Sequence, residues 1–173
     1  MIKNKMYVYA IAVRPKGIMF PIVAWLIMIF QGMNPFKKES YSHLAIRYVG
    51  KDDRFYIIDS TNSGKVSVKL ESEFLKKYKI VNLALLPGVK YESFKEWENS
   101  ILLREYDKLQ IVGLFLKCIG IISKNKWGHN YKKMTCNEVV LNYLEKNLNL
   151  NFGDPDNYDL NMTWDIVKTY KIF

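Results

Sequence analysis

Residues 43–70 read HLAIRYVGKDDRFYIIDSTNSGKVSVKL, and this stretch decides the fold class. Three runs rich in β-branched and aromatic residues are separated by two runs of turn residues, GKDD and STNSG. Short runs of this composition with turns between them are typical of neighbouring antiparallel strands. The stretch therefore predicts strands over residues 43–49, 54–59 and 65–70, arranged as a meander.

Further strands and helices are expected on both sides of this stretch. Residues 6–13 (MYVYAIAV) and 79–86 (KIVNLALL) have the composition of strands, and the second is expected to continue the meander after the polar run ESEFLKKY. Helices are predicted from apolar spacing and terminal signals over residues 21–32, 91–109, 111–124 and 136–148, with a short C-terminal helix capped near Asn161 or Thr163. The expected fold class is α+β, an antiparallel sheet with packed helices.

Size and charge limit the classes of protein and partner. The chain has 173 residues, of which 49% are hydrophobic, and no repeat or Pro/Gly/Ser-rich linker divides it, so we expect a single domain over residues 1–173. Its 26 basic and 17 acidic residues give a net charge of +9. This charge favours an anionic partner, such as nucleic acid, an anionic membrane surface or a charged cell-wall polymer, and does not choose among them.

One apolar segment raises the question of a membrane. The run over residues 18–30 is 13 residues long and contains Pro21, whereas a spanning helix needs about 20 apolar residues. We therefore expect a buried helix and no transmembrane span, with contact to a membrane surface as the alternative. The absence of a secretory signal and the small number of cysteines indicate a reducing compartment, namely the cytoplasm, or the host cytoplasm or virion if the protein is phage-encoded.

The two cysteines stand in different surroundings. Cys118 lies within the apolar run GLFLKCIGII and is expected in the core, whereas Cys136 lies in KKMTCNEVV, directly after Thr135, a good helix N-cap. A helix N-terminus and basic neighbours such as Lys132 and Lys133 stabilise a thiolate, the form in which cysteine is a nucleophile. Cys136 is therefore the candidate nucleophile, and the alternative is a small buried apolar residue.

A cysteine nucleophile needs a base, and the sequence offers two histidines. His43 opens a predicted strand, where alternation places it on one face with Ala45 and Arg47, whereas His129 lies in the glycine-containing loop KWGHNYKK and is expected at the surface. We expect His43 to be the base. The cysteines and histidines do not recur at metal-ligand spacings, so no metal and no cofactor are expected.

The third group follows from the predicted hairpin. If its turn is Gly50–Asp52, Val49 pairs with Asp53, and further along the ladder His43 faces Asp59. Residues opposite each other in an antiparallel pair share a face, so Asp59 is expected to hold the imidazole. A slip of one residue would place Ser60 there, and Asp59 would otherwise begin an Asx turn into STNSG.

These motifs and their order resemble the permuted branch of the NlpC/P60 papain-like superfamily. An apolar helix leads into YSHLAIRY, a strand ends in FYIIDS, and a helix begins with TCNEVV, so that the resemblance covers roughly residues 8–168. It implies a circularly permuted papain-like fold in which His43 precedes the nucleophile, the reverse of the usual order. By motif position Cys136 matches the nucleophile, His43 the base and Asp59 the third polar position, which is more often Glu, His, Asn or Gln in the family.

The resemblance implies a thiol hydrolase that acts on amide bonds, or on esters or thioesters in some relatives. The leading expectation is a cysteine peptidase or amidase with a peptide or amide substrate, including cell-wall peptides, and walls formed by the loops 31–41, 60–66 and 123–131. Two alternatives stay open. One is a non-catalytic basic binding or virion-associated module on the same scaffold. The other is a lipid-directed acyltransferase or thioesterase, in which residues 20–30 would face a membrane.

Overall fold

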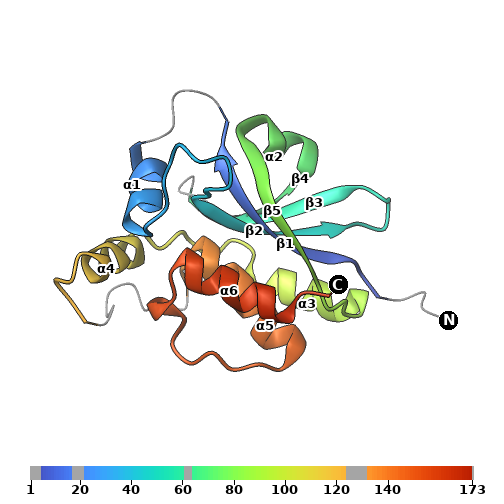
Figure 1. Ribbon diagram of the computed structural model, residues 1–173. Helices are drawn as coiled ribbons and strands as arrows, with labels where there is room; N and C mark the ends of the chain where they lie inside the picture. Colours follow the sequence, from blue (N-terminus) through green and yellow to red (C-terminus); the bar gives the residue numbers. More distant parts are fainter. Residues whose placement is uncertain (1–4, 17–21, 61–63, 124–131, 173) are drawn as a thin grey trace.

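The computed structural model describes residues 5–16, 22–60, 64–123 and 132–172. The elements are, in chain order, β1 (Val8–Pro15), α1 (Ile22–Phe30), β2 (His43–Val49), β3 (Phe55–Ser60), β4 (Val66–Leu70), α2 (Glu71–Lys77), β5 (Tyr78–Leu86), α3 (Tyr91–Ile101), α4 (Lys108–Cys118), α5 (Cys136–Leu148), the 3-10 turn η1 (Pro155–Asn157) and α6 (Leu160–Tyr170). They form an α+β fold around a five-stranded antiparallel sheet (Figure 1).

The strand order is β4-β3-β2-β1-β5, which corrects the predicted meander at its last strand. Strands β1 to β4 follow one another, but β5 pairs with β1 at the opposite edge and not with β4. The run ESEFLKKY is the reason, because most of it folds as α2, which contacts β3, β4 and β5 and buries Phe74. This helix returns the chain across one face of the sheet.

The β2–β3 hairpin also differs from the predicted register. Val49 pairs with Phe55, so the connection is Gly50–Arg54 and is two residues longer than expected. Asp53 adopts a left-handed conformation with φ 58°, and the Gly50 N–H donates to the Arg54 carbonyl (N···O 2.8 Å). Because side chains alternate with a period of two, a shift of two residues leaves every side chain on its predicted face.

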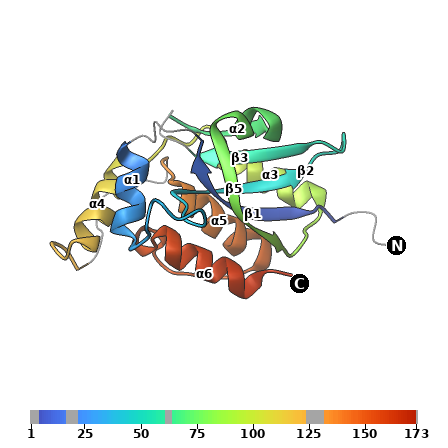
Figure 2. The ribbon, with the colours of Figure 1, turned by 45° about the horizontal axis from the view of Figure 1, so that its top comes forward.

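Two apolar clusters cover the two faces of the sheet. The larger joins one face to α3, α5 and α6, and its fully buried side chains include Leu44, Ile46, Phe94 and Tyr143. The smaller lies under α2 and contains Ile11, Val13, Ala45, Ile57 and Phe74. In both Figure 1 and Figure 2, α2 lies on the opposite side of the sheet from α5 and α6. The sheet is therefore the middle of three layers.

Helices α1 and α4 lie side by side beyond one end of the sheet (Figures 1 and 2). The Phe30 ring of α1 meets the Phe115 ring of α4 edge to face, with 4.2 Å between centroids. A helix in the apolar run 18–30 is confirmed for its described part, while residues 18–21 lie outside the described residues. The expected burial holds for only one side of this helix, because Ala24 and Met28 are buried whereas Leu26 and Ile29 are 43% and 50% exposed. No described helix is long and apolar enough to cross a membrane.

Several helix boundaries differ from the prediction, and the helix expected over residues 111–124 runs from Lys108 to Cys118 as α4. The expected helix over residues 91–109 ends at Ile101, because Leu103 turns left-handed (φ 66°), and α4 begins after Asp107, whose carboxylate accepts from the Gln110 N–H (3.1 Å). The C-terminal helix begins earlier than expected. Its cap is Asp159, whose carboxylate accepts from the Met162 N–H (2.8 Å). The starts of α4 and α6 are thus each fixed by an aspartate carboxylate that caps the first turn of the helix.

Candidate functional site

Cys136 is the first residue of α5, and Thr135 is the N-cap, as predicted. Thr135 and Glu138 form a capping box, in which the Thr135 backbone N–H donates to the Glu138 carboxylate (2.5 Å). The first N–H groups of a helix have no partner within it and carry the positive end of the dipole. The Cys136 thiol, only 4% exposed, is thus held where a negative charge is stabilised.

His43 and Asp59 are hydrogen-bonded, with 2.5 Å between His43 Nε2 and Asp59 Oδ1, which confirms their predicted contact. The register that led to the prediction was wrong, but its error of two residues kept Asp59 on the face of His43. Lys69 of β4 donates to the other carboxylate oxygen of Asp59 (2.9 Å). Burial disfavours the Asp59 charge, but His43 and Lys69 outweigh it and hold the pKa of Asp59 below its usual value.

The imidazole of His43 also contacts Cys136. Burial lowers the pKa of His43, yet the charges of a Cys136 thiolate and of Asp59, with a hydrogen bond to each, raise it to about 10. Nε2 is the ring nitrogen that bonds to Asp59. The Tyr78 ring stacks on the imidazole at 5.8 Å between centroids and limits its rotation. Cysteine, histidine and aspartate thus form a continuous chain of contacts.

The contacts among Cys136, His43 and Asp59 lie where the sheet meets the start of α5. The first residue of β2 and the last residues of β3 lie at the same end of the sheet, because the strands are antiparallel. Ser60 donates to the Met134 carbonyl (2.6 Å) in a buried bond that ties the end of β3 to the segment before Cys136. Ser60 therefore anchors the helix start and does not hold the imidazole. The Asp59 carboxylate bonds to His43 and Lys69, while residues 61–63 of the alternative turn lie outside the described residues.

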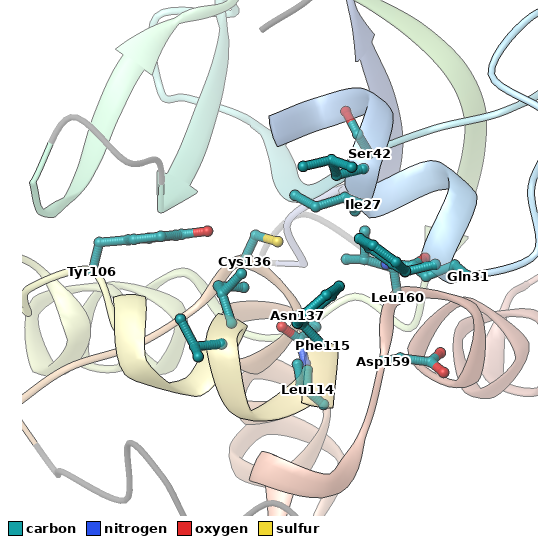
Figure 3. A pocket seen from close by; sticks show the side chains of 14 residues that line it. Ile27, Gln31, Ser42, Tyr106, Leu114, Phe115, Cys136, Asn137, Asp159 and Leu160 are labelled. Carbon is teal, nitrogen blue, oxygen red and sulfur yellow. The ribbon is translucent and has the colours of Figure 1, made fainter. Parts of the chain in front are cut away.

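Tyr106 is a site residue that the sequence prediction missed. It lies in the connection between α3 and α4, and Figure 3 shows its hydroxyl directed toward Cys136. Burial, followed by the charges of Cys136 and Asp59, raises the pKa of Tyr106 far above its ordinary value. Its hydroxyl therefore keeps its proton and is available as a donor beside the thiol. Tyr106 was missed because the sequence predicted one continuous helix over residues 91–109, whereas the chain leaves the helix after Ile101 and Tyr106 lies in the connection to α4.

A cavity of about 360 Å³ adjoins Cys136 (Figure 3). Its described walls come mainly from α1 and α4, with the starts of α5 and α6. Of the loops that the sequence suggested, residues 31–41 contribute Gln31, while residues 61–63 and 124–131 lie outside the described residues. The lining residues are Leu26, Ile27, Phe30, Gln31, Ser42, Tyr106, Ile111, Val112, Leu114, Phe115, Cys136, Asn137, Asp159 and Leu160. Most of them are apolar, and the sulfur atom of Cys136 points into the space they surround.

The remaining predicted residues are placed only in part. Cys118 is the last residue of α4, but its side chain and all of His129 lie outside the described residues. Across the described part of the chain, no three His, Cys, Asp or Glu side chains gather so as to hold a metal ion.

Fold and site together define an α+β protein with a buried cysteine, histidine and aspartate in contact at a helix N-terminus. Neither the models of known protein families nor the curated proteins contain a match to this chain.

Proposed function

We propose that this protein is a thiol hydrolase of the cysteine peptidase or amidase type, with Cys136 as nucleophile, His43 as general base and acid, and Asp59 as the group that orients His43. The observation that carries the proposal is the His43 ring, which is hydrogen-bonded to Asp59 on one side and to Cys136 at the start of α5 on the other. Nucleophile, base and orienting group in this sequence of contacts are what acyl transfer through a thiol requires.

The order of the elements supports a permuted papain-like arrangement. The strands that carry His43 and Asp59 come first, and the helix that begins with Cys136 follows them and packs mainly on β2. In this proposal the fold is a circularly permuted papain-like one, in which the sheet supplies the base and the helix supplies the nucleophile.

Each step can be assigned to a group in the site. The Cys136 thiolate attacks the carbonyl carbon of the substrate and forms an S–C bond, while the carbonyl oxygen becomes an oxyanion. The Cys136 backbone N–H and the protonated Tyr106 hydroxyl donate hydrogen bonds to this oxyanion. The imidazolium of His43 then gives its proton to the leaving group as the scissile bond breaks. Water, deprotonated by His43, attacks the acyl-enzyme and releases the acid and the free thiol.

The test is the alkylation of Cys136 by iodoacetamide at neutral pH in a Cys118→Ala background, followed by mass spectrometry. Cys136 in the folded protein should react at least about tenfold faster than in the urea-unfolded chain, because thiolate formation controls the rate. His43→Ala should abolish this advantage. His129→Ala, which removes the other histidine in the sequence, is the matched control and should retain it. Equal rates in folded and unfolded protein would remove the basis of the proposal.

A further inference from the structure

We propose that Lys69 is a positioning residue of the site, which holds one oxygen of the Asp59 carboxylate and thereby sets the pH range in which His43 can accept a proton. This inference rests on the proposed function, because it states what controls the protonation of the proposed base. Lys69 has no part in the sequence-based expectation, since nothing in the run VSVKL distinguishes its lysine from the others in the chain.

The position of Lys69 follows from the pairing of β3 with β4. Lys69 lies opposite Ile57, and Asp59 lies opposite Ser67. Residues two apart in a strand point to the same face, so Lys69 is the diagonal neighbour of Asp59. Such neighbours are about 7–8 Å apart, within reach of a long side chain. The Lys69 ammonium donates to Asp59 Oδ2 (2.9 Å), while Oδ1 bonds to His43.

Burial makes this contact more important to Asp59 than to Lys69. Asp59 is fully buried, whereas the Lys69 side chain is 36% exposed on β4, an edge strand of the sheet. A buried carboxylate oxygen that loses its donor pays the full desolvation cost, whereas an exposed ammonium can turn to water. Asp59 therefore depends on Lys69, and the chain of contacts from Cys136 reaches solvent through the Lys69 ammonium.

The other groups that face Asp59 do not replace this charge. The titratable groups whose charges or hydrogen bonds act on Asp59 or its imidazole partner are His43, Lys69, Tyr78, Tyr106 and Cys136. Burial raises the pKa of both tyrosines, so they are neutral. Arg47, a further cation on this face of the sheet, is hydrogen-bonded to Glu71 (2.7 Å). Lys69 thus supplies a permanent positive charge beside the exchangeable proton of His43.

The sign of the effect follows from the order of the charges. A positive charge held at Asp59 stabilises the carboxylate and disfavours a second positive charge on His43. When that charge is removed, His43 keeps its proton to a higher pH. A general base must be neutral before it can take a proton from water, so hydrolysis of the acyl-enzyme should then begin at a higher pH.

The first experiment measures the protonation of His43 directly and does not depend on catalysis. In the full chain carrying Cys136→Ala and His129→Ala, His43 is the remaining histidine, and NMR of its ring protons gives its titration midpoint. Lys69→Met should raise this midpoint by about one pH unit, the lower end of the effect of a nearby charge, because Lys69 is partly exposed. Lys69→Gln, a second neutral variant that keeps a polar side chain, should raise it as well.

Two matched variants serve as controls. Lys69→Arg keeps the charge and the donor, and it should leave the midpoint within about 0.3 unit of the parent. Lys76→Met removes a lysine from α2, which covers the same face of the sheet, but this side chain is 67% exposed. Its charge is screened by water, so the midpoint should again stay within about 0.3 unit.

The second experiment tests the effect on the reaction, with S-acetyl-N-acetylcysteamine as the probe and Cys118→Ala as the background. The Cys136 thiolate forms an S–C(=O) bond with the acetyl group, the C–S bond of the probe breaks, and the departing thiolate takes the proton of His43. Water then hydrolyses acetyl-Cys136 to acetic acid and the free thiol. Mass spectrometry follows this hydrolysis between about pH 5 and pH 10, and the rate in the urea-unfolded chain is subtracted.

A positioning role and a purely structural role give different pH profiles. Lys69→Met should reach the parent plateau with a midpoint about one unit higher, so that hydrolysis below the midpoint is about tenfold slower. A lysine that only supports the fold would lower the plateau and leave the midpoint unchanged, and that result would overturn the inference.

The outcomes separate this inference from the proposed function. If the His43 midpoint is unchanged in both neutral variants, or rises as much in Lys69→Arg, the inference is wrong, while hydrolysis of acetyl-Cys136 faster than in unfolded protein would still support the thiol hydrolase. If the midpoint rises as expected but acetyl-Cys136 in the folded parent is hydrolysed no faster than in the unfolded chain, Lys69 controls His43 and the proposed function fails.

Discussion

Replacement of Asp59 by asparagine tests the central contact of the site, because Asn keeps the shape of the side chain and removes its charge. Asp59 is fully buried and accepts from His43 (2.5 Å) and from Lys69 (2.9 Å). Charge-assisted hydrogen bonds contribute about 1.5–3 kcal/mol each. The Lys69 side chain is 36% exposed and can turn to water, so its part is small, whereas His43 would lose the counter-charge of its imidazolium inside the protein.

We expect Asp59→Asn to lower the free energy of unfolding by about 2–4 kcal/mol at neutral pH, near the lower end of the cost of breaking a buried ion pair. For a chain of this length that is roughly 2–4 °C in Tm per kcal/mol. The folded-state pKa of Asp59 lies below its ordinary value of 3.8, so the carboxylate contributes its full stability above about pH 4. That contribution is lost as the pH falls through the lower, folded-state pKa, and the difference between the two proteins should then shrink.

Urea unfolding between pH 7 and pH 3, followed by circular dichroism, measures both effects. The control is Asp53→Asn, which removes the same charge from an exposed turn, where the φ of 58° suits asparagine. It should change stability by less than about 0.5 kcal/mol. The reasoning is refuted if Asp59→Asn is as stable as the control at pH 7, or if the difference does not depend on pH. Alkylation of Cys136 should slow less in Asp59→Asn than in His43→Ala, because an amide can still orient the imidazole.

Three further predictions concern other residues of the candidate site. Folding raises the pKa of His43 from 6.5 to about 10, so the stability that its proton contributes is complete below about pH 6.5 and is lost as the pH rises toward 10. In urea unfolding, the stability of His43→Gln should therefore differ more from that of the wild type near pH 6 than near pH 9.5. A difference in stability that grows with pH would contradict this assignment. Tyr106→Phe should leave iodoacetamide alkylation unchanged but slow thioester acylation about 10- to 100-fold, because only the second reaction forms an oxyanion, and an equal loss in both assays would assign Tyr106 to packing. Thr135→Ala should cost about 1 kcal/mol in unfolding free energy and also slow alkylation of Cys136, while Thr169→Ala in exposed α6 surface should do neither.

The parts of the site that could be predicted from the sequence are those with local signals. The strand His43–Val49 follows from alternation, and the helix Cys136–Leu148 follows from its N-cap and apolar stripe, and both have the predicted boundaries. The pairing of His43 with Asp59 was reached through a wrong turn length. It survived because the left-handed Asp53 lengthened the hairpin by an even number of residues. An error of one residue would have removed Asp59 from the site.

The features that could not be predicted depend on contacts between distant segments. The position of β5 beside β1 is decided by α2, whose polar composition resembles that of a loop. The cavity exists because α1 meets α4, and no local pattern in either helix indicates that contact. Tyr106 enters the site only because the chain breaks between α3 and α4. The cavity beside Cys136 is therefore less predictable from the sequence than the contacts among Cys136, His43 and Asp59.

The position of the strands ahead of α5 in the chain has a consequence for protein synthesis. Ribosomes deliver the N-terminal part first, so the hairpin that joins His43 to Asp59 can form before Cys136 has been translated. The far wall of the cavity, at Leu160, arrives later still. In a nascent chain the His43–Asp59 pair can therefore form before Cys136 is made, and Cys136 is made before α6 completes the cavity. A product terminated before α5 holds the histidine and aspartate without Cys136. In this order of synthesis the thiol of Cys136 appears after its histidine and before the C-terminal helix that walls its cavity.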